Sequence, residues 1–242
     1  MVSLVPSLTE LVCELGLAQA LVGRTGFCIH PRATVRRIPK MGGTKSVDLD
    51  RVRAAEPTHV IVNVEENTKE TADALAGFVP NLIVTDVRDP EDNPALYRRI
   101  GAAFGREAEA EALAARFEAA WRATRERAKP ERRVLYLIWR RPWMTVSRDT
   151  YISRMLAAFG LTTVPGIVEP RYPEIALDSP EVAAADWVLA ATEPYPFRAK
   201  DLGEITAATG RPARLVDGEM TSWYGPRAIA GLRYLAGLSS SL

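Results

Sequence analysis

Apolar residues recur along this chain with two different periods, and the change from one to the other predicts alternating strands and helices. A short apolar strand opens the chain, and Ser7 followed by Glu10 has the capping-box spacing of a helix start. That helix is expected to end at Gly16. Apolar runs at residues 60–63 and 82–86 predict further strands, each preceded by a helix. Short connections between such elements favour a parallel sheet covered on both faces.

The pattern changes between about residues 94 and 127, where Ala, Glu and Arg predominate. Apolar side chains recur there at helical spacing, at Leu96, Ile100, Phe104, Leu113, Phe117 and Trp121. We predict one long helix, or two helices joined near Gly101 and Gly105. Lys129 and Pro130 are expected to end it. A single helix of this length would reach roughly 50 Å, which is enough to link two lobes.

The second half of the chain repeats the organisation of the first. Residues 47–62 and 175–190 each contain Leu-Asp, a short helix ending in alanines, an acidic residue and then a strand. A repeat of this length predicts two lobes of related topology. We therefore predict an α/β fold with two Rossmann-like lobes with parallel sheets, over 1–90 and 131–242, joined by a long backbone helix over 91–130. Ligands of open parallel sheets bind beyond the carboxyl ends of the strands, so a cleft between the lobes is expected.

Composition narrows the class of protein. The 242 residues include 31 basic and 30 acidic ones, well mixed along the chain, which gives no basic face for nucleic acid and no strong attraction to a membrane surface. No apolar run approaches the roughly 18 residues needed to cross a bilayer. The first residues lack the features of a signal peptide. We expect a cytoplasmic protein as the sequence stands, and a periplasmic or lipid-anchored one if an N-terminal signal has been omitted.

Motifs typical of enzymes are not visible. The sequence has no Gly-x-Ser-x-Gly elbow, no Walker loop, no GxGxxG after the first strand and no His-Glu-x-x-His. Met-Gly-Gly-Thr at 41–44 lacks the spacing of a phosphate-binding loop. The absence of these motifs does not by itself exclude catalysis.

Several segments together resemble one known family: residues 2–11, 22–25, 41–44, 49–62 and the Trp-Tyr-Gly-Pro-Arg sequence at 223–227. With them, nearly the whole chain resembles the helical-backbone, or class III, periplasmic binding proteins. These are the receptors for vitamin B12, haem and ferric siderophores that serve ABC importers. The resemblance implies a monomer whose backbone helix limits hinge motion. It also implies a metal chelate bound between the lobes without chemistry, and a permease as partner. We therefore expect a binding protein that is not an enzyme and requires no cofactor.

The resemblance also indicates which loops line the ligand site. Their candidate residues are Pro6, Ser7, Arg24, Phe27, Thr44, Asn63, Glu65, Glu66, Trp139, Arg140, Trp143, Tyr172, Tyr195, Trp223 and Tyr224. Aromatic residues are concentrated at the predicted strand ends, and a flat macrocycle such as a corrin is bound largely by stacking on such side chains. A corrinoid, cobalamin above all, is therefore the first candidate ligand, with haem or a ferric siderophore as the alternative.

The vitamin B12 receptors place tryptophans in two N-lobe loops where this chain has Thr44 and Asn63. Only the C-lobe tryptophan position keeps an aromatic residue, as Tyr172. We expect Trp139 and Trp143 to compensate from the C-terminal lobe.

Two polar groups have alternative interpretations. Cys28 and His30 lie two residues apart in a loop, where either is a candidate axial ligand for a cobalt or iron macrocycle. The alternative is a cysteine packed inward beside a surface histidine. Glu65 and Glu66 either face the ligand or belong to the start of the next helix, which Asn67 and Thr68 are suited to cap.

Three further features remain open in the same way. Arg140, with Arg141, either clamps a carboxylate or phosphate or forms a solvated rim. The aromatic pair at 223–224 exceeds what a turn needs and favours ligand contact. In transporter-linked relatives one glutamate on each lobe docks on the permease, and Glu70 and Glu204 are the nearest matches; the alternative is two solvated helix acids. A signal-less cytoplasmic carrier or enzyme that handles a small anionic metabolite is the competing function.

Overall fold

The computed structural model describes residues 1–125 and 131–242. The chain forms two compact units that interleave along the sequence. Unit 1 consists of Met1–Val87, Asn93–Ala115 and Tyr224–Pro226, and unit 2 of Arg88–Asp92, Arg116–Trp223 and Arg227–Leu242. The boundaries predicted at 90 and 130 treat each lobe as one contiguous stretch, whereas these units exchange short segments.

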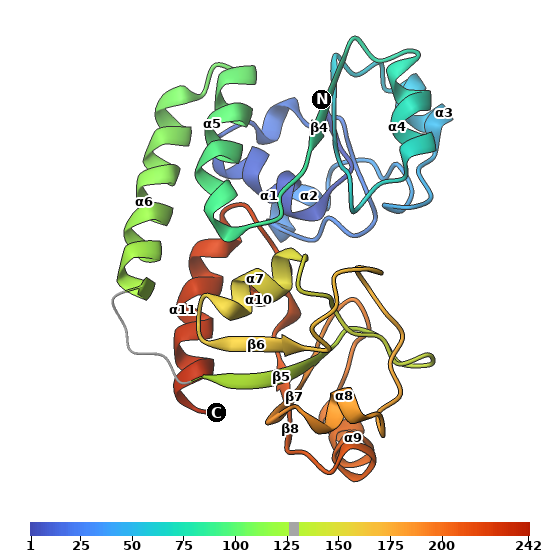
Figure 1. Cartoon of the computed structure of the whole chain (residues 1–242). Coiled ribbons are helices and arrows are strands. Elements are labelled where there is room, and N and C mark those ends of the chain that lie inside the picture. Colours follow the sequence, from blue (N-terminus) through green and yellow to red (C-terminus); the bar gives the residue numbers. More distant parts are fainter. Residues whose placement is uncertain (126–130) are drawn as a thin grey trace. The chain divides into compact units, whose positions relative to one another are not determined.

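Unit 1 contains a four-stranded parallel sheet in the order β2-β1-β3-β4, of which Figure 1 labels β4. The strands are β1 (Val2–Ser3), β2 (Gly23–Arg24), β3 (His59–Asn63) and β4 (Asn81–Thr85). The helices between them are α1 (Pro6–Glu14), η1 (Ala18–Ala20), α2 (Arg32–Val35), α3 (Leu49–Ala54) and α4 (Lys69–Ala76). The core is an apolar cluster contributed by Val2 in β1, Leu4 just after it, alternate positions of β3 and the helices α3 and α4; it includes Val52, Val60, Val62 and Leu75.

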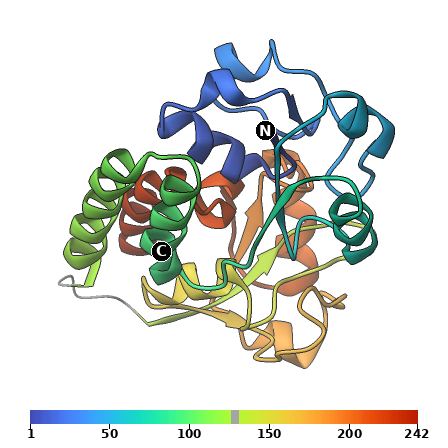
Figure 2. The same cartoon turned by 90° about the horizontal axis from the view of Figure 1, so that it is seen from above.

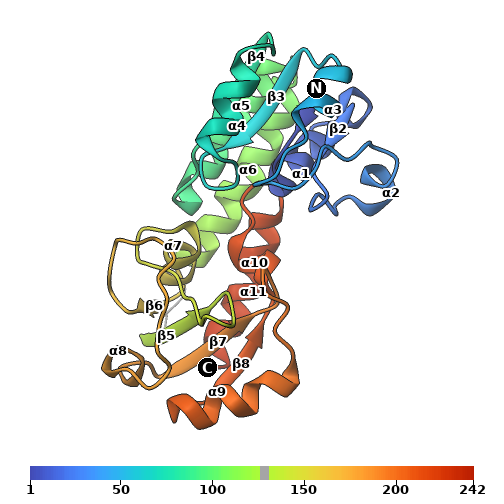
Figure 3. The same cartoon turned by 90° about the vertical axis from the view of Figure 1, so that its right-hand side faces the viewer.

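Unit 2 contains a second four-stranded parallel sheet, in the order β6-β5-β7-β8. The strands are β5 (Arg132–Leu137), β6 (Leu161–Val164), β7 (Trp187–Ala191) and β8 (Ala213–Val216). The helices are α7 (Tyr151–Ala157), α8 (Pro180–Ala183), η3 (Ala199–Asp201), α9 (Leu202–Thr209), α10 (Gly218–Ser222) and α11 (Arg227–Ser240). Figure 3 shows α8 and α9 on one side of this sheet and α7 and α11 on the other.

Both sheets have the same strand order: the first strand of each unit lies between the second and the third. The repeated segments supply the helix before the third strand in each unit, α3 and α8. The Asp48 and Ser179 side chains cap these helices by accepting from the backbone N–H groups of Arg51 and Val182. The predicted fold class, two Rossmann-like lobes with parallel sheets, is therefore confirmed.

The start of α1 differs from the prediction. The helix begins at Pro6, and Val5 at the N-cap makes no side-chain capping bond. Ser7 lies inside the first turn and is buried, so the predicted capping box with Glu10 is wrong. Proline at the first helical position has the backbone φ that a helix needs, which starts this helix without a capping side chain.

The stretch from 94 to 127 forms two helices, which was the second of the two predicted alternatives. The 3-10 turn η2 (Pro90–Asp92) comes first. The two helices that follow it, α5 (Asn93–Ala103) and α6 (Glu107–Arg125), lie side by side and antiparallel (Figures 1 and 2). Gly105, at φ +65°, makes the turn between them. The 19 residues of α6 span about 28 Å, well below the roughly 50 Å that one continuous helix over residues 94–127 would reach. Lys129 and Pro130 lie outside the described residues. Among those described, none of the helices combines the length and the apolar character that a membrane span needs.

Candidate functional site

The strand order of each sheet indicates where a ligand would bind. In each sheet the first strand, β1 or β5, has the second strand on one side and the third strand on the other, so the strand order reverses there. Ligands of open α/β sheets bind beyond the carboxyl ends of the strands at the point where the order reverses. We define the unit 1 half-site as residues 4–7, 25–30, 42–44 and 63–67. The unit 2 half-site is residues 138–149, 165–175 and 192–197.

Exposed apolar side chains gather in these two half-sites. Within the described residues, the large exposed ones other than Val22 and Val84 all follow the carboxyl ends of β2, β3, β5 or β6: Phe27, Ile29, Val64, Trp139, Ile167, Val168 and Tyr172. Phe27 is 61% exposed, Trp139 41% and Tyr172 37%. Single exposed apolar residues are normal, but their concentration at one edge of each sheet is typical of a binding surface.

Asn67 holds the loops of the unit 1 half-site together. Its buried amide nitrogen donates to the backbone carbonyls of Leu4 (3.3 Å) and Thr44 (3.0 Å), and its Oδ1 accepts from the N–H of Asn63 (3.0 Å). One side chain therefore joins the loops after β1 and β3 to the Thr44 loop. Thr68, not Asn67, is the N-cap of α4, with its hydroxyl accepting from a backbone N–H in the first turn.

Asn63 has a structural position at the end of β3. Its amide nitrogen donates to the carbonyl oxygen of Thr85 (3.1 Å). Its Oδ1 accepts from the N–H groups of Glu65 (2.8 Å) and Glu66 (3.4 Å). The side chain is buried and bends the backbone, which favours a framework role over ligand contact for Asn63. The Glu65, Glu66 and Thr44 side chains are half-buried at this edge.

Arg24 and Cys28 are used inside unit 1. The Arg24 guanidinium is buried and donates to the backbone carbonyls of Val35 (2.8 Å) and Thr25 (2.9 Å), which shapes the loop after β2. Cys28 is fully buried, and the hydroxyls of Thr9 and Thr25 lie 3.1 and 3.2 Å from its Sγ. Burial raises the pKa of the Cys28 thiol, which disfavours the thiolate that a metal would need.

The other candidates in unit 1 differ in how exposed they are. His30 is half-buried, and among the described residues no group of three or more His, Cys, Asp and Glu side chains is placed to hold a metal ion. Pro6 is half-buried at the start of α1, while Ser7 is buried in its first turn. Phe27 thus presents the largest exposed apolar surface among the unit 1 candidates.

An aromatic cluster, defined here as Trp139, Trp143, Tyr195 and Phe197, lies in the unit 2 half-site. Trp139 meets Tyr195 edge-on (5.7 Å between ring centroids), and Tyr195 meets Phe197 in the same way (4.7 Å). Trp143 stacks on Phe197 at 6.0 Å with 4° between the ring planes. Phe197 is buried in the core of unit 2, whereas Trp139 is exposed. The cluster therefore runs from the core to the surface at the carboxyl ends of β5 and β7.

Arg140 is engaged by two carboxylates of unit 2. Its Nη1 donates to Asp201 Oδ1 at 2.9 Å and its Nη2 donates to Glu204 Oε2. The guanidinium carbon lies 5.7 Å from the centroid of the Trp143 ring. With these partners the side chain is 18% exposed, which disfavours the interpretation of Arg140 as a clamp for an anion of the ligand. Sequence reasoning missed Asp201, because its partner lies 61 positions away.

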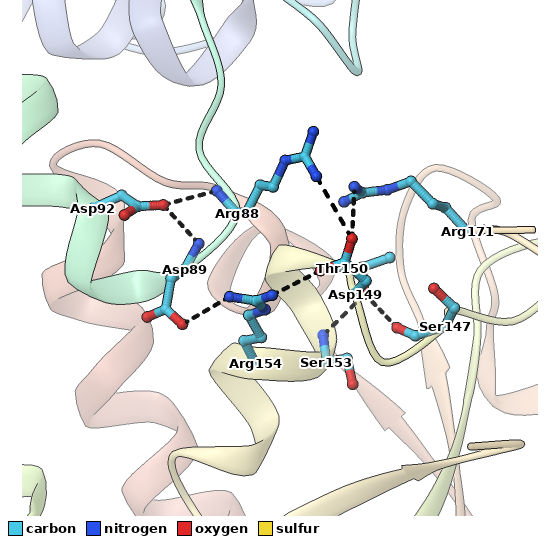
Figure 4. Close-up of polar contacts among 9 residues, drawn as sticks. All are labelled: Arg88, Asp89, Asp92, Ser147, Asp149, Thr150, Ser153, Arg154 and Arg171. Atoms are coloured by element: carbon cyan, nitrogen blue, oxygen red, sulfur yellow. Dashed lines mark hydrogen bonds and ion pairs between the residues drawn. The ribbon is translucent and has the colours of Figure 1, made fainter. Parts of the chain in front are cut away.

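An ion-pair cluster around Asp149 fixes the loop that carries Tyr172 (Figure 4). Asp149 Oδ1 accepts from Arg154 at 2.7 Å, and its Oδ2 lies 3.4 Å from Arg171 and 3.6 Å from Arg88. The loop backbone also pairs with the preceding segment, since the N–H of Ser147 donates to the carbonyl of Arg171 (2.8 Å). Asp149 was not among the sequence candidates, because nothing in its local pattern indicates partners this far apart.

Trp223 is buried, contrary to what its sequence context suggests. Its indole N–H donates to Glu193 Oε1 at 2.6 Å, and the Ser222 hydroxyl donates to the same oxygen at 3.0 Å. Burial raises the pKa of Glu193. Tyr224 is also buried. Both aromatic side chains thus have little surface for direct ligand contact, and Glu193, at the end of β7, is a polar group that sequence reasoning treated only as part of a loop.

Glu70 and Glu204 occupy equivalent places in the two units. Each lies in the first turn of the helix between the third and fourth strands, α4 and α9. Glu70 is exposed, and hydrogen bonds from its own backbone N–H and from the Thr68 hydroxyl lower its pKa. Glu204 is about half exposed and pairs with Arg140.

The chain is similar in sequence to known proteins. The sequence pattern of a family described as "Periplasmic binding protein" matches residues 1–208. An uncharacterized ABC transporter substrate-binding lipoprotein of Bacillus subtilis, YvrC, is 28% identical over 97% of this chain and 78% of its own length.

Solved structures share the fold over nearly the whole chain. The periplasmic vitamin B12 binding protein BtuF of Vibrio cholerae matches with a TM-score of 0.84 and 12% identity, covering 99% of this chain and 96% of its own. The periplasmic haem-binding protein RhuT of Roseiflexus matches with a TM-score of 0.81 and 23% identity, with the same coverages.

Proposed function

This chain belongs to the periplasmic binding protein family, and we propose that it is the substrate-binding protein of an ABC-type importer whose ligand is a metal chelate. The B. subtilis relative is named as an ABC transporter substrate-binding lipoprotein, and the structural relatives as B12- and haem-binding proteins. We propose that this protein likewise binds its ligand outside the cytoplasm and delivers it without chemical change.

The observation that carries this proposal is the exposed face of Trp139 at the carboxyl end of β5. Its ring packs edge-on against Tyr195, which packs edge-on against the buried Phe197, so the core holds the exposed indole rigidly. A rigid aromatic face contributes stacking and apolar burial at little cost in conformational entropy. Phe27 offers a second exposed ring in the unit 1 half-site. Such surfaces suit a flat, partly apolar ligand.

A corrinoid is the first ligand we propose, with haem or a ferric siderophore as the alternative. The half-sites offer apolar and amide surfaces together with the half-buried carboxyl groups of Glu65 and Glu66. The periphery of a corrin carries amides, which hydrogen-bond to carboxylates and backbone groups. This mode of binding uses neither Arg140, which is engaged within the protein, nor Cys28, whose thiol is buried.

We further propose Glu70 and Glu204 as the residues that meet the permease. They lie at equivalent positions of the two repeated folds, and both are accessible. The positive end of a helix stabilises the charged form of a carboxylate in its first turn, and arginine binds a carboxylate through two parallel hydrogen bonds.

The test is a calorimetric titration of ligand-free protein with cobalamin, cobinamide and haemin. We expect saturable corrinoid binding at micromolar or tighter affinity, weakened about tenfold or more by Trp139→Ala and by Phe27→Ala. Trp121→Ala is the matched control: it removes an indole that stacks on Phe117 in the α6 region, and the affinity should not change.

The outcomes of the titration distinguish the ligand, the receptor function and the role of Trp139. Binding of haemin alone would replace the corrinoid by haem and keep the receptor function. Absence of binding to all three would overturn the metal-chelate proposal and favour the competing function with a small anionic metabolite. Equal losses in the Trp139 and Trp121 variants would remove Trp139 from the site.

A further inference from the structure

Arg140 lies next to Trp139 in a tight turn whose two ends are joined through the backbone. The N–H of Met144 donates to the carbonyl of Trp139 (3.2 Å), and the N–H of Ile138 donates to the carbonyl of Met144 (3.0 Å). Residues 140–143 form the tip of this turn. Trp139 and Met144 are thus the two residues that close this turn.

Two side chains of the tip, those of Arg140 and Trp143, are held by different parts of unit 2. Trp143 packs against the apolar core and stacks on Phe197. Arg140 reaches to η3 and α9, where it meets Asp201 and Glu204. Its guanidinium also lies over the Trp143 ring, a favourable cation–π arrangement. Arg140 thus connects the turn, the aromatic cluster and α9.

The two carboxylates differ in environment. Asp201 is 4% exposed, and its second oxygen accepts from the backbone N–H of Arg198 at 2.8 Å, which fixes its position. The Glu204 side chain is 47% exposed, so its attraction to Arg140 is screened by solvent. A buried carboxylate without its cation is strongly disfavoured, whereas an exposed one is hydrated. Asp201 is therefore the main anchor of Arg140.

We propose that Arg140 is a positioning residue that sets the exposed face of Trp139 for the ligand, without touching the ligand itself. This inference rests on the proposed function, because Trp139 is the ligand contact in that proposal. It replaces the interpretation of Arg140 as an anion clamp. Arginine suits this place because its planar fork reaches two carboxylates while its flat face covers an indole.

The first readout is the Trp139 ring itself, which needs no ligand. Protein labelled with 5-fluorotryptophan is observed by fluorine NMR, and the Trp139 resonance is assigned by its loss in Trp139→Phe. In Arg140→Met we expect this resonance to shift or broaden, while the resonance of Trp121 in α6 keeps its position. An unchanged Trp139 resonance in a folded Arg140→Met protein would overturn the inference, whatever the ligand proves to be.

The second readout is affinity for the corrinoid or haem identified by titration. We expect a loss of about tenfold in Arg140→Met and in Asp201→Asn, a smaller loss in Glu204→Gln, and partial recovery in Arg140→Lys, which keeps the charge but not the fork. Arg98→Met is the matched control: it breaks an equally close pair, Arg98 Nε to Glu111 Oε2 at 2.7 Å in unit 1, and affinity should not change.

The two proposals fail in different ways. If wild-type protein binds none of the probes but the Trp139 resonance responds to Arg140→Met, the receptor proposal fails and the positioning role stands. If the ligand binds and Arg140→Met leaves the affinity unchanged, the positioning role fails. Urea unfolding of each variant shows whether it is folded, and Arg140→Lys keeps the test open if Arg140→Met does not fold.

Discussion

Glu193 is a largely buried carboxylate whose environment makes folding stability depend on pH. Burial raises its pKa above the usual value of about 4.5, although the Ser222 hydroxyl and the Trp223 indole N–H oppose this. The folded state therefore binds the proton more tightly than the unfolded state. It follows that this group's contribution to stability falls as pH rises from about 4.5 through the raised pKa, and is constant above it.

Glu193→Gln removes this titration and keeps an oxygen that accepts both hydrogen bonds. We expect the free energy of unfolding of the variant, relative to wild type, to rise with pH across that window and then to level off. Urea unfolding at closely spaced pH values from 4 to 8 measures it. Glu193→Ala is the comparison: it also removes the titration, but it leaves the buried Trp223 N–H without its acceptor, so it should be about 1–3 kcal/mol less stable than Glu193→Gln at every pH. A relative stability of the Gln variant that falls with pH would contradict this account.

Some residues of the candidate site could be placed from the local sequence pattern, and others only from their partners in the structure. The placement of Phe27 and Trp139 at strand ends followed from the sequence, and both are exposed there. Asn67, Asp149 and Asp201 were missed or given another role, because each acts on partners distant in the chain. Polar residues in loops look alike in sequence whether they hold a loop or face a ligand. Only the positions of their partners distinguish the two.

At the scale of elements, the close packing of α5 on α6 depends on Gly101. A Cβ at this position would lie 2.5 Å from the Cβ of Ala110 and 2.8 Å from the carbonyl oxygen of Arg106. These atoms belong to the turn and to the first turns of α6, so they move only if the two helices move apart. The glycine was identified from sequence as a possible helix junction; in the structure it is inside α5 and serves packing instead.

Gly101→Ala should therefore destabilise the protein by about 1–3 kcal/mol, measured by urea unfolding followed by circular dichroism. Gly237→Ala is the matched control, since Gly237 is also inside a helix, α11, but a Cβ there would meet nothing within 4 Å. That change should raise stability by up to about 1 kcal/mol, because alanine is the better helix former. Equal effects of the two substitutions would show that the helix pair does not need the close approach.

At the scale of the whole molecule, the two units are interleaved in the chain. Gly225 lies between α10 and α11 of unit 2 in sequence, yet it belongs to unit 1. There its N–H donates to Asn93 Oδ1 and its carbonyl accepts from the Tyr97 hydroxyl, both at 2.7 Å and buried. Neither unit is therefore a continuous piece of chain, and each holds a short segment that the other's sequence surrounds.

Tyr97→Phe tests whether this interleaving couples the units in unfolding. It removes one buried hydrogen bond of unit 1 and should cost about 1–3 kcal/mol. All five tryptophans of the chain lie in unit 2, so their fluorescence reports that unit, while circular dichroism reports both. We expect both signals to shift to lower urea together. A shift in circular dichroism with an unchanged fluorescence transition would show that the units unfold independently.

Sequence alone determined the class of fold and its repetition, because the period of apolar residues and the repeat at 47–62 and 175–190 are local patterns that secondary structure must obey. It also indicated that aromatic residues gather at strand ends. Only the tertiary structure decided which of them stay exposed: Trp223 is bound to Glu193, and Trp139 is supported by Tyr195. Burial and pairing depend on neighbours 30 to 61 positions away in the chain, and apolar periodicity carries no information about such partners.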